Sequence, residues 1–271
     1  MHVEATIERV LHAALATFAG LPGATIADEH DHTRLATRTP HAPFNNVLGL
    51  RLDGADLERR IGWILGRFVP HSLPVTWWVT PLARPGDVGT RLLGLGFEPI
   101  PPEFGMVLDL GPGLPPLDGP PGSSLETVRT RAALDEWLDV MGGAYAWSDR
   151  GKADLIRGLY VPWLATPDLP TPQHFIARLD ARPVACSSLY VVAGEAFVTN
   201  IGTVPAARGR GMGRLATLAT LHLARQAGHP RAMLTASLDG REVYRRLGFA
   251  EYGRLDRYLA GPAAAARLGL G

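Results

Sequence analysis

The chain has 271 residues, a length that suggests two domains or one large one. Apolar residues make up 46% of the chain and charged residues 20%, a mixture that can bury a core and that excludes wholesale disorder. The formal net charge is +1, so no overall field points to a nucleic-acid or membrane-surface partner.

The first predicted element is an amphipathic helix near the N-terminus. Apolar residues recur there at helical spacing, at Ile7, Leu11, Leu15 and Phe18. Glu4 precedes any sustained basic stretch, which does not fit a secretory signal peptide. No uninterrupted apolar run approaches the ~18 residues that a membrane span needs. We therefore expect a soluble, cytoplasmic protein.

A polar segment and a strand follow in the first half. The tripeptide His-Asp-His at 30–32 and His41 lack the helical spacing or the paired cysteine of a metal site, so we expect a solvated loop and no metal. Val75–Thr80 has the pattern of a strand, and we expect Trp77 and Trp78 to lie in the core or in an interface.

The clearest break in the chain is the segment Gly111–Gly122. It contains five prolines and four glycines, a composition that cannot sustain a helix or a central strand. We predict an interdomain linker over 113–122, which separates a first domain of residues 1–112 from a second domain of residues 123–271.

The second half predicts an α/β fold, a mixed sheet with helices on both faces. In chain order the predicted elements are a strand (Leu125–Arg129), two helices (Arg131–Met141, Lys152–Ala165), three strands (His174–Leu179, Val184–Val192, Glu195–Val204), a helix (Gly213–Ala227), a strand (Arg231–Ser237), a helix (Arg241–Leu247) and a last strand (Phe249–Tyr258). Ala193-Gly194 predicts a tight hairpin, and Cys186 is expected as a buried apolar residue.

The first half partly repeats this pattern. A strand, a helix-like segment and a Leu-Gly-Phe triplet ending at Phe97 resemble the strand, helix and triplet that end at Phe249, which lies 152 residues later. A diverged duplication explains the repeat, and a coincidence of common residues is the alternative.

The most informative stretch runs from Val204 to Leu215, between a predicted strand and a predicted helix. Its three glycines alternate along the chain, which permits positive φ and lets successive backbone N–H groups point into one concavity. The following helix adds the positive end of its dipole, and three arginines add charge. These features predict a pyrophosphate site formed by Thr203, Val204, Arg208, Gly209, Arg210, Gly211, Met212, Gly213 and Arg214.

Other phosphate-binding motifs do not fit this stretch. A Walker loop needs Gly-Lys-Ser/Thr and a dinucleotide fingerprint needs G-x-G-x-x-G, and neither is present. A glycine-rich surface turn is the plain alternative. The pattern Arg208-x-x-Gly211-x-Gly213 resembles the acyl-CoA pyrophosphate loop of the GNAT-type N-acetyltransferases, and the later Tyr244-x-x-Leu-Gly-Phe element fits the same family.

The resemblance covers Leu125 to about Tyr258 and implies two related GNAT-like domains. The first half lacks the arginine and two of the glycines of the loop, so it resembles a degenerate copy that has lost cofactor binding. The resemblance implies acetyl-CoA as co-substrate, no metal, and transfer of an acetyl group to an amine by direct attack in a ternary complex. We expect the first domain to complete the acceptor cleft of the second.

The resemblance also assigns roles to residues around the loop. A backbone N–H of the strand before the loop is expected to stabilise the oxyanion, and Gly202 would allow the necessary bulge. Tyr244 is the candidate general acid, with a packing tyrosine as the alternative. Asn200 occupies the position of the family's acidic base, and an asparagine cannot take a proton at neutral pH. Glu195, Tyr190 and a chain of waters are the remaining candidates for the base.

The acceptor is the least determined part of the site. The family's acceptor pocket implies roles for Tyr145, Trp147 and Asp149, with Tyr190 from the neighbouring strand, although Asp149 can equally cap a helix. We expect a small-molecule or peptide amine as partner, no nucleic acid and no membrane, and a monomer (a pseudo-dimer within the chain) or a homodimer. Two alternatives stay open: a non-catalytic CoA-binding sensor or scaffold, and an acyltransferase that acts on a thiol or hydroxyl.

Overall fold

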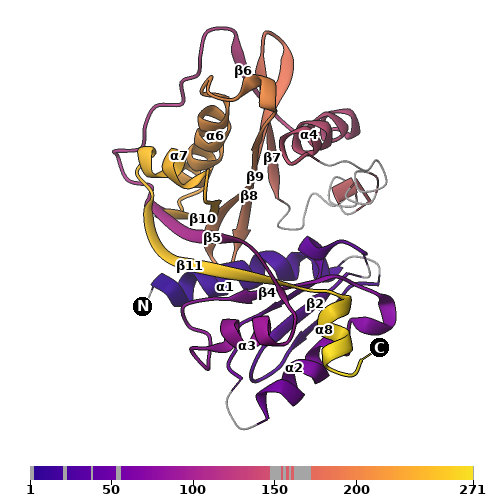
Figure 1. Ribbon diagram of the computed structural model, residues 1–271. Coiled ribbons are helices and arrows are strands. Elements are labelled where there is room, and N and C mark those ends of the chain that lie inside the picture. Colours follow the sequence, from indigo (N-terminus) through magenta and orange to yellow (C-terminus); the bar gives the residue numbers. More distant parts are fainter. Residues whose placement is uncertain are drawn as a thin grey trace. The chain divides into compact units, whose positions relative to one another are not determined.

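The chain folds into two compact units in a computed structural model that describes residues 3–20, 23–37, 39–52, 56–146, 154, 157–158, 160–161 and 172–270. The first unit comprises residues 1–106, 235–241 and 251–271, and the second comprises 107–234 and 242–250. Each unit is a sheet with helices on both faces (Figure 1), so the predicted α/β fold is confirmed.

The sheet of the first unit has the strand order β1-β2-β3-β4-β11-β5. Its helices and strands are α1 (Val3–Ala16), η1 (Thr17–Gly20), β1 (Thr25–Asp28), β2 (Thr33–Ala36), η2 (Ala42–Phe44), β3 (Asn46–Leu48), α2 (Leu57–Leu65), η3 (Val69–His71), β4 (Val75–Val79), α3 (Val88–Gly94), β5 (Glu98–Asp109), β11 (Ala250–Ala260) and α8 (Pro262–Arg267). The amphipathic helix predicted at the N-terminus is therefore confirmed as α1.

The core of the first unit lies between its sheet and the helices α2, α3 and α8. Ile61, Leu92 and Ala264 from these helices and Trp77 from β4 are fully buried in one apolar cluster. The Trp77 ring meets Phe97 edge to face at 5.2 Å between centroids. The core position predicted for Trp77 is therefore confirmed. Burial of this much aromatic surface favours the packing of the helices against the sheet.

The second unit has the strand order β10-β9-β8-β7-β6. Its elements are β6 (Ser123–Thr127), α4 (Arg131–Ala144), β7 (Gln173–Leu179), β8 (Arg182–Val192), β9 (Glu195–Thr203), η4 (Pro205–Ala207), α6 (Met212–Gln226), β10 (Arg231–Ser237) and α7 (Arg241–Arg246). The last residues of β10, from Thr235 on, and Arg241 at the start of α7 belong to the first unit. Helices α4 and α6 cover opposite faces of β7–β9 (Figure 1).

The predicted elements of the second half agree with these bounds to within a few residues. The Ala193-Gly194 hairpin joins β8 to β9, and Cys186 is fully buried, as predicted. The helix predicted over Lys152–Ala165 lies largely outside the described residues. No helix of the described chain has both the length and the apolar character needed to cross a bilayer.

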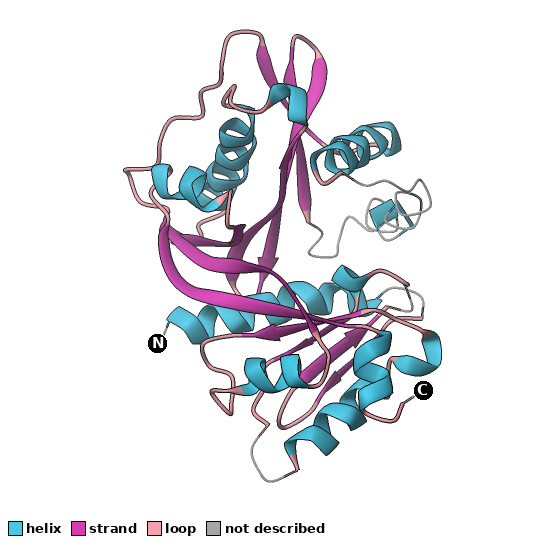
Figure 2. Cartoon of the chain, in the orientation of Figure 1, coloured by secondary structure: helices cyan, strands magenta, loops and turns pink. Residues whose placement is uncertain are grey.

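The proline- and glycine-rich segment 111–122 contains no helix or strand (Figure 2). It lies within the second unit, where His222 of α6 is hydrogen-bonded through Nε2 to the carbonyl oxygen of Pro115 at 2.8 Å. The chain passes between the units inside β5, after Met106, and the residues from Glu251 onward return to the first unit. The predicted boundaries at 112 and 123 do not coincide with these divisions.

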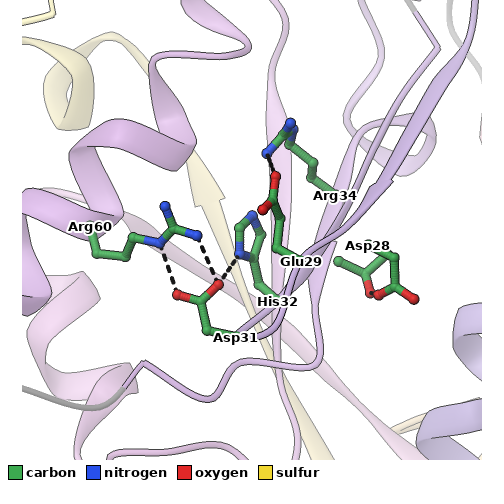
Figure 3. A network of polar contacts seen from close by, with 7 residues as sticks. Asp28, Glu29, Asp31, His32, Arg34 and Arg60 are labelled. Atoms are coloured by element: carbon green, nitrogen blue, oxygen red, sulfur yellow. Dashed lines mark hydrogen bonds and ion pairs between the residues drawn. The ribbon is translucent and has the colours of Figure 1, made fainter.

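The tripeptide at 30–32 is not the solvated loop that we expected. Asp31 and His32 are 6% and 2% exposed. Arg60 of α2 binds both carboxylate oxygens of Asp31, with its Nε and Nη2 at 2.8 and 2.9 Å, and His32 Nδ1 lies 2.8 Å from Asp31 Oδ1 (Figure 3). The partner comes from a helix 29 residues later in the chain, which local composition cannot reveal. Among the described residues, no group of three His, Cys, Asp or Glu is arranged to hold a metal ion.

Candidate active site

The glycine loop has the backbone conformation that its sequence predicts. Gly209 and Gly211 have φ of +74° and +79°, in the left-handed region that favours glycine. Gly213 is needed for a different reason, because a Cβ atom there would lie 2.9 Å from Thr203 Oγ1 at the end of β9. Two of the glycines therefore turn the chain, and the third lets α6 start close to the strand.

The loop delivers the chain to the N-terminus of α6. Gly211 is the residue that precedes this 15-residue helix, and no side chain caps the helix there. The first turn of α6 contains no acidic residue. The N–H groups of the first turn therefore have no intrahelical acceptor and no side-chain cap, and together with the helix dipole they favour an anion at this position.

The three arginines of the loop have different surroundings. Arg208 donates from Nε to the carbonyl of Thr203 at 3.2 Å and from Nη2 to that of Ala144 at 3.0 Å, and so joins the end of α4 to the end of β9. Arg214 donates to Asp118 Oδ1 at 2.8 Å and lowers the pKa of that carboxyl. Arg210 is exposed at the rim of the loop. Met212 is fully buried, so only its backbone is available to a ligand.

The strands before and after the loop diverge. Within the described chain, β9 and β10 pair in parallel at two positions, Ala196 with Ala232 and Phe197 with Met233. Among the described residues, no further pair of β9 with β10 follows toward the loop. Backbone N–H and C=O groups on this side of β9 are therefore free of the ladder and can bind an extended ligand.

The bulge in β9 lies at Asn200 and not at Gly202, where we expected it. Gly202 pairs in register with Cys186, whereas Asn200 and Ile201 together stand opposite Ser187. Asn200 has φ of +52°, which asparagine tolerates better than most residues. Glycine is needed at position 202 for close packing, because a Cβ atom there would lie 2.7 Å from the Cβ atom of Ala144.

Side chains from neighbouring elements bind the bulge. Cys186 Sγ donates to the carbonyl of Asn200 at 3.3 Å, and the hydroxyl of Tyr145 donates to that of Ile201 at 3.1 Å. The Asn200 amide donates to Ser188 Oγ at 3.2 Å and reaches the Tyr160 hydroxyl at 3.5 Å. The predicted residues Tyr145 and Asn200 are thus brought together at the bulge.

Two buried tyrosines lie beside this amide. The hydroxyls of Tyr160 and Tyr190 are hydrogen-bonded to each other, and burial raises the pKa of both above the ordinary value of 10.0. Both phenols therefore stay protonated at neutral pH and can orient a neighbouring group but not remove a proton. Trp147 and Asp149, which we predicted for the acceptor pocket, lie outside the described residues.

Tyr244 lies on α7 and is 8% exposed. Its ring meets Phe249 edge to face at 5.9 Å, and its carbonyl accepts hydrogen bonds from the N–H groups of Leu247 and Phe249. The Tyr-x-x-Leu-Gly-Phe element is thus one compact turn that fixes the direction of α7. The general-acid role of Tyr244 stays a prediction.

Glu195 is not brought to the bulge. It lies at the opposite end of β9, five residues from Asn200, a distance of about 16 Å along an extended strand. Arg231 binds both of its carboxylate oxygens, with Nε to Oε2 at 2.9 Å and Nη2 to Oε1 at 2.5 Å. This ion pair joins β9 to β10 where the two strands are still adjacent.

Sequence reasoning did not single out three residues of this site: His174, Ser188 and Tyr160. His174 of β7 stands directly opposite Ser188 of β8, and its Nδ1 lies 2.7 Å from Ser188 Oγ. The two strands were predicted, but their register was not, and the register is what places these side chains together.

Known proteins resemble this chain in sequence. Residues 134–249 match the acetyltransferase (GNAT) family. A mycothiol acetyltransferase of Thermomonospora curvata is 31% identical over 149 residues, which are 51% of this chain and 48% of that protein. A mycothiol acetyltransferase of Rhodococcus erythropolis is 27% identical over 220 residues, 64% of this chain and 71% of that protein. The chain thus spans about half the length of the first of these relatives.

Solved structures share the fold along nearly the whole chain. A GCN5-related N-acetyltransferase from Kribbella flavida superposes with a TM-score of 0.72 at 19% identity, over 97% of this chain and 96% of that one. A tandem GNAT protein from the clavulanic acid biosynthesis pathway superposes with a TM-score of 0.61 at 16% identity, over 94% and 92% of the two chains. At these identities the likeness concerns the fold.

Proposed function

Since the chain belongs to the acetyltransferase (GNAT) family through its second half, we propose that it transfers an acetyl group from acetyl-CoA to an amine by direct attack in a ternary complex. The observation that carries this proposal is the glycine loop between the free end of β9 and the uncapped N-terminus of α6. This arrangement suits a diphosphate, because backbone N–H groups and a helix dipole act at one point.

In this proposal the loop binds the diphosphate of the coenzyme. The N–H groups from Gly209 to Gly213 point at the phosphates, and Arg210 adds a positive charge at the rim. Thr203 and Val204 bind the pantetheine arm through their backbone, because β9 has left β10 at that point. Arg208 and Arg214 stabilise the segments around the loop through hydrogen bonds to Ala144 and Asp118.

The acyl carbonyl lies against the bulge at Asn200 and Ile201. A backbone N–H turned out of the ladder there stabilises the oxyanion of the tetrahedral intermediate, and the loss of one such donor costs about 3 kcal/mol of transition-state stabilisation. Tyr244 protonates the departing thiolate. Transfer of a proton from a phenol with a pKa of about 10 to a thiolate whose conjugate acid has a pKa of about 8.5 is uphill by about 2 kcal/mol, a cost that a single catalytic step can bear.

The attacking amine loses its proton to water. Asn200 cannot act as a base, the hydroxyls of Tyr160 and Tyr190 hold their protons more tightly than ordinary phenols, and Arg231 binds the carboxylate of Glu195. Among the candidates for the proton acceptor, a chain of waters leading to solvent remains.

Amines related to mycothiol are the first acceptors to test, because mycothiol acetyltransferases are the relatives found by sequence. We propose that Tyr145, Trp147, Asp149 and Tyr190 contact the acceptor. Tyr145 is 52% exposed and bonded to the bulge, which supports a position between solvent and the acyl group.

Two measurements in sequence test the proposal. Calorimetry of the purified chain should show binding of CoA and acetyl-CoA, and a chain that releases no heat with either would refute it. Thiol release from acetyl-CoA should then rise with at least one amine of a panel. Binding without turnover favours a CoA-binding sensor, the alternative that Asn200 in place of an acid suggests, and turnover only with thiols or alcohols identifies a different acceptor atom.

A further inference from the structure

A line of buried polar side chains connects β7 to the bulge of β9. His174 Nδ1 lies 2.7 Å from Ser188 Oγ, and Ser188 Oγ lies 3.2 Å from the amide nitrogen of Asn200. His174 is 4% exposed and Ser188 is fully buried. A buried polar group destabilises the fold unless it is hydrogen-bonded. Each side chain of this line therefore needs its hydrogen-bond partner.

The direction of the hydrogen bond between Asn200 and Ser188 follows from the donor that is present. The Asn200 amide nitrogen can only donate, so Ser188 Oγ accepts from it. When His174 carries its proton on Nε2, its Nδ1 accepts a hydrogen bond from the hydroxyl of Ser188. Burial lowers the pKa of His174 to about 3, so the imidazole is neutral at neutral pH and its Nδ1 can accept this hydrogen bond.

Asn200 is held at three points. Its side chain binds Ser188 and Tyr160, and its carbonyl accepts from Cys186. Its φ of +52° is an uncommon conformation for a residue with a Cβ, and such a conformation persists where the surroundings determine it. The anchored amide therefore fixes the backbone at the bulge.

We propose that His174 and Ser188 are positioning residues for acyl transfer: they anchor the Asn200 amide and thereby aim the N–H groups of the bulge at the thioester carbonyl. Neither residue touches the reacting atoms. The inference rests on the proposed function, because it concerns the carbonyl of bound acetyl-CoA.

Packing is the competing explanation for His174. Its ring lies 4.4 Å from that of Trp137 and 5.2 Å from that of Tyr160. Two substitutions separate the roles. His174→Phe keeps a ring in this cluster and removes the acceptor, whereas His174→Asn removes the ring and keeps an acceptor near the position of Nδ1.

Ser188 has a matched control on the same strand. Ser187 is also fully buried, but it faces the other side of the sheet and donates to the carbonyl of Ala216 in α6 at 2.8 Å. Ser188→Ala and Ser187→Ala each remove one buried hydroxyl, and only the first breaks the line to Asn200.

The experiment measures the carbonyl stretch of bound [1-¹³C]acetyl-CoA by infrared difference spectroscopy, together with kcat and KM for thiol release with an amine of the panel that is a substrate. In the unaltered chain and in His174→Asn and Ser187→Ala, the bound carbonyl should absorb at lower frequency than the free one. In His174→Phe and Ser188→Ala, the shift should shrink and kcat should fall about tenfold, with KM for acetyl-CoA unchanged.

An Asn200→Gly chain tests the same point if Ser188→Ala fails to fold. Glycine accepts the positive φ without an anchored side chain, so His174→Phe should have no further effect on the carbonyl shift in that background. The inference is overturned if His174→Phe behaves like the unaltered chain while His174→Asn loses the shift, or if Ser187→Ala and Ser188→Ala are equally impaired. Failure of the proposed function is distinct, since the unaltered chain would then bind no acetyl-CoA.

Discussion

Arg208, Arg210 and Arg214 occupy one motif, yet their contacts differ. Arg208 bonds to two backbone carbonyls, Arg214 pairs with Asp118, and Arg210 is exposed. A guanidinium that is already bonded to protein must exchange those bonds to bind a phosphate, so the three contribute unequally to an anion site. The charge of a residue is evident from sequence, but its availability depends on which partners fold beside it.

Tyr244→Phe tests the proposed general acid. The aromatic ring against Phe249 is kept and the hydroxyl is lost, so affinity for acetyl-CoA and stability should change little. The value of kcat should fall by about tenfold to a hundredfold, because proton transfer to the leaving thiolate loses its donor. Steady-state thiol release measures this.

The matched control for Tyr244→Phe is Tyr252→Phe, which removes a phenol hydroxyl from a residue that is 41% exposed. If both variants turn over at the rate of the unaltered chain, Tyr244 has no part in proton transfer.

The first unit should lose stability in mild acid. Burial lowers the pKa of His32 below 6.5, and the hydrogen bond from Arg60 lowers that of Asp31 well below 3.8. Below about pH 6.5 the unfolded histidine binds a proton that the folded one does not, so the free energy of unfolding falls as the pH falls. Below about pH 4 the Asp31 carboxylate takes up a proton in the unfolded chain before it does so in the folded one, so its contribution to the free energy of unfolding is lost as the pH falls further.

Denaturant unfolding at pH 7.5, 6.5 and 5.5 measures this acid effect when hydrogen exchange of the β1–β2 amides is used as the probe of the first unit. The variant His32→Phe should show a weaker pH dependence in this range. A stability of the first unit that is constant from pH 7.5 to 5.5 in the unaltered chain would contradict the pKa shift of His32.

Among the elements, the loop and helix at 204–226 are the part of the site whose conformation follows from residues that are close together in the sequence. Positive φ at Gly209 and Gly211 and the uncapped start of α6 follow from residues within one short stretch. The neighbouring strand β9 behaves differently, because its bulge depends on contacts with β8, Tyr145 and Tyr160.

Gly211→Glu should abolish binding of CoA. The substitution places a carboxylate and a Cβ atom at the N-terminus of α6, where like charge repels the diphosphate and the positive φ strains any side chain. Calorimetry should detect at least a hundredfold loss of affinity.

Gly228→Glu is the control at the other end of the same helix. Gly228 has φ of +85° and no atom within 4 Å of an added Cβ, so the backbone strain is comparable and the charge lies far from the loop. Retained CoA affinity in Gly211→Glu, or an equal loss in both variants, would refute the assignment of the loop.

At the scale of the whole molecule, the last strand of the chain completes the first unit. Residues Asp256–Ala260 of β11 pair antiparallel with Val75–Val79 of β4, and Ala260 and Ala264 are buried in the core of that unit. The two compact units are therefore not two consecutive stretches of sequence.

A fragment of residues 1–112 should not fold, because β4 would lose the strand beside it and the core would lose α8. The same fragment joined by a flexible linker to residues 251–271 should recover a cooperative unfolding transition. Circular dichroism and amide chemical-shift dispersion measure both, and a well-dispersed spectrum from 1–112 alone would contradict this interpretation.

By itself, the sequence determined the α/β class, nearly every element of the second half, the conformation of the glycine loop and the resemblance to the family. These features depend on residues close together in the chain, such as alternating glycines, hairpin signals and apolar periodicity. Only the tertiary structure decided the position of the bulge at Asn200, the line from His174 through Ser188, the burial of Asp31 with Arg60 and the return of β11 to the first unit. Each of these joins residues that are distant in sequence, and strand register and long-range ion pairs are chosen by the packing of the whole core, which no local pattern encodes.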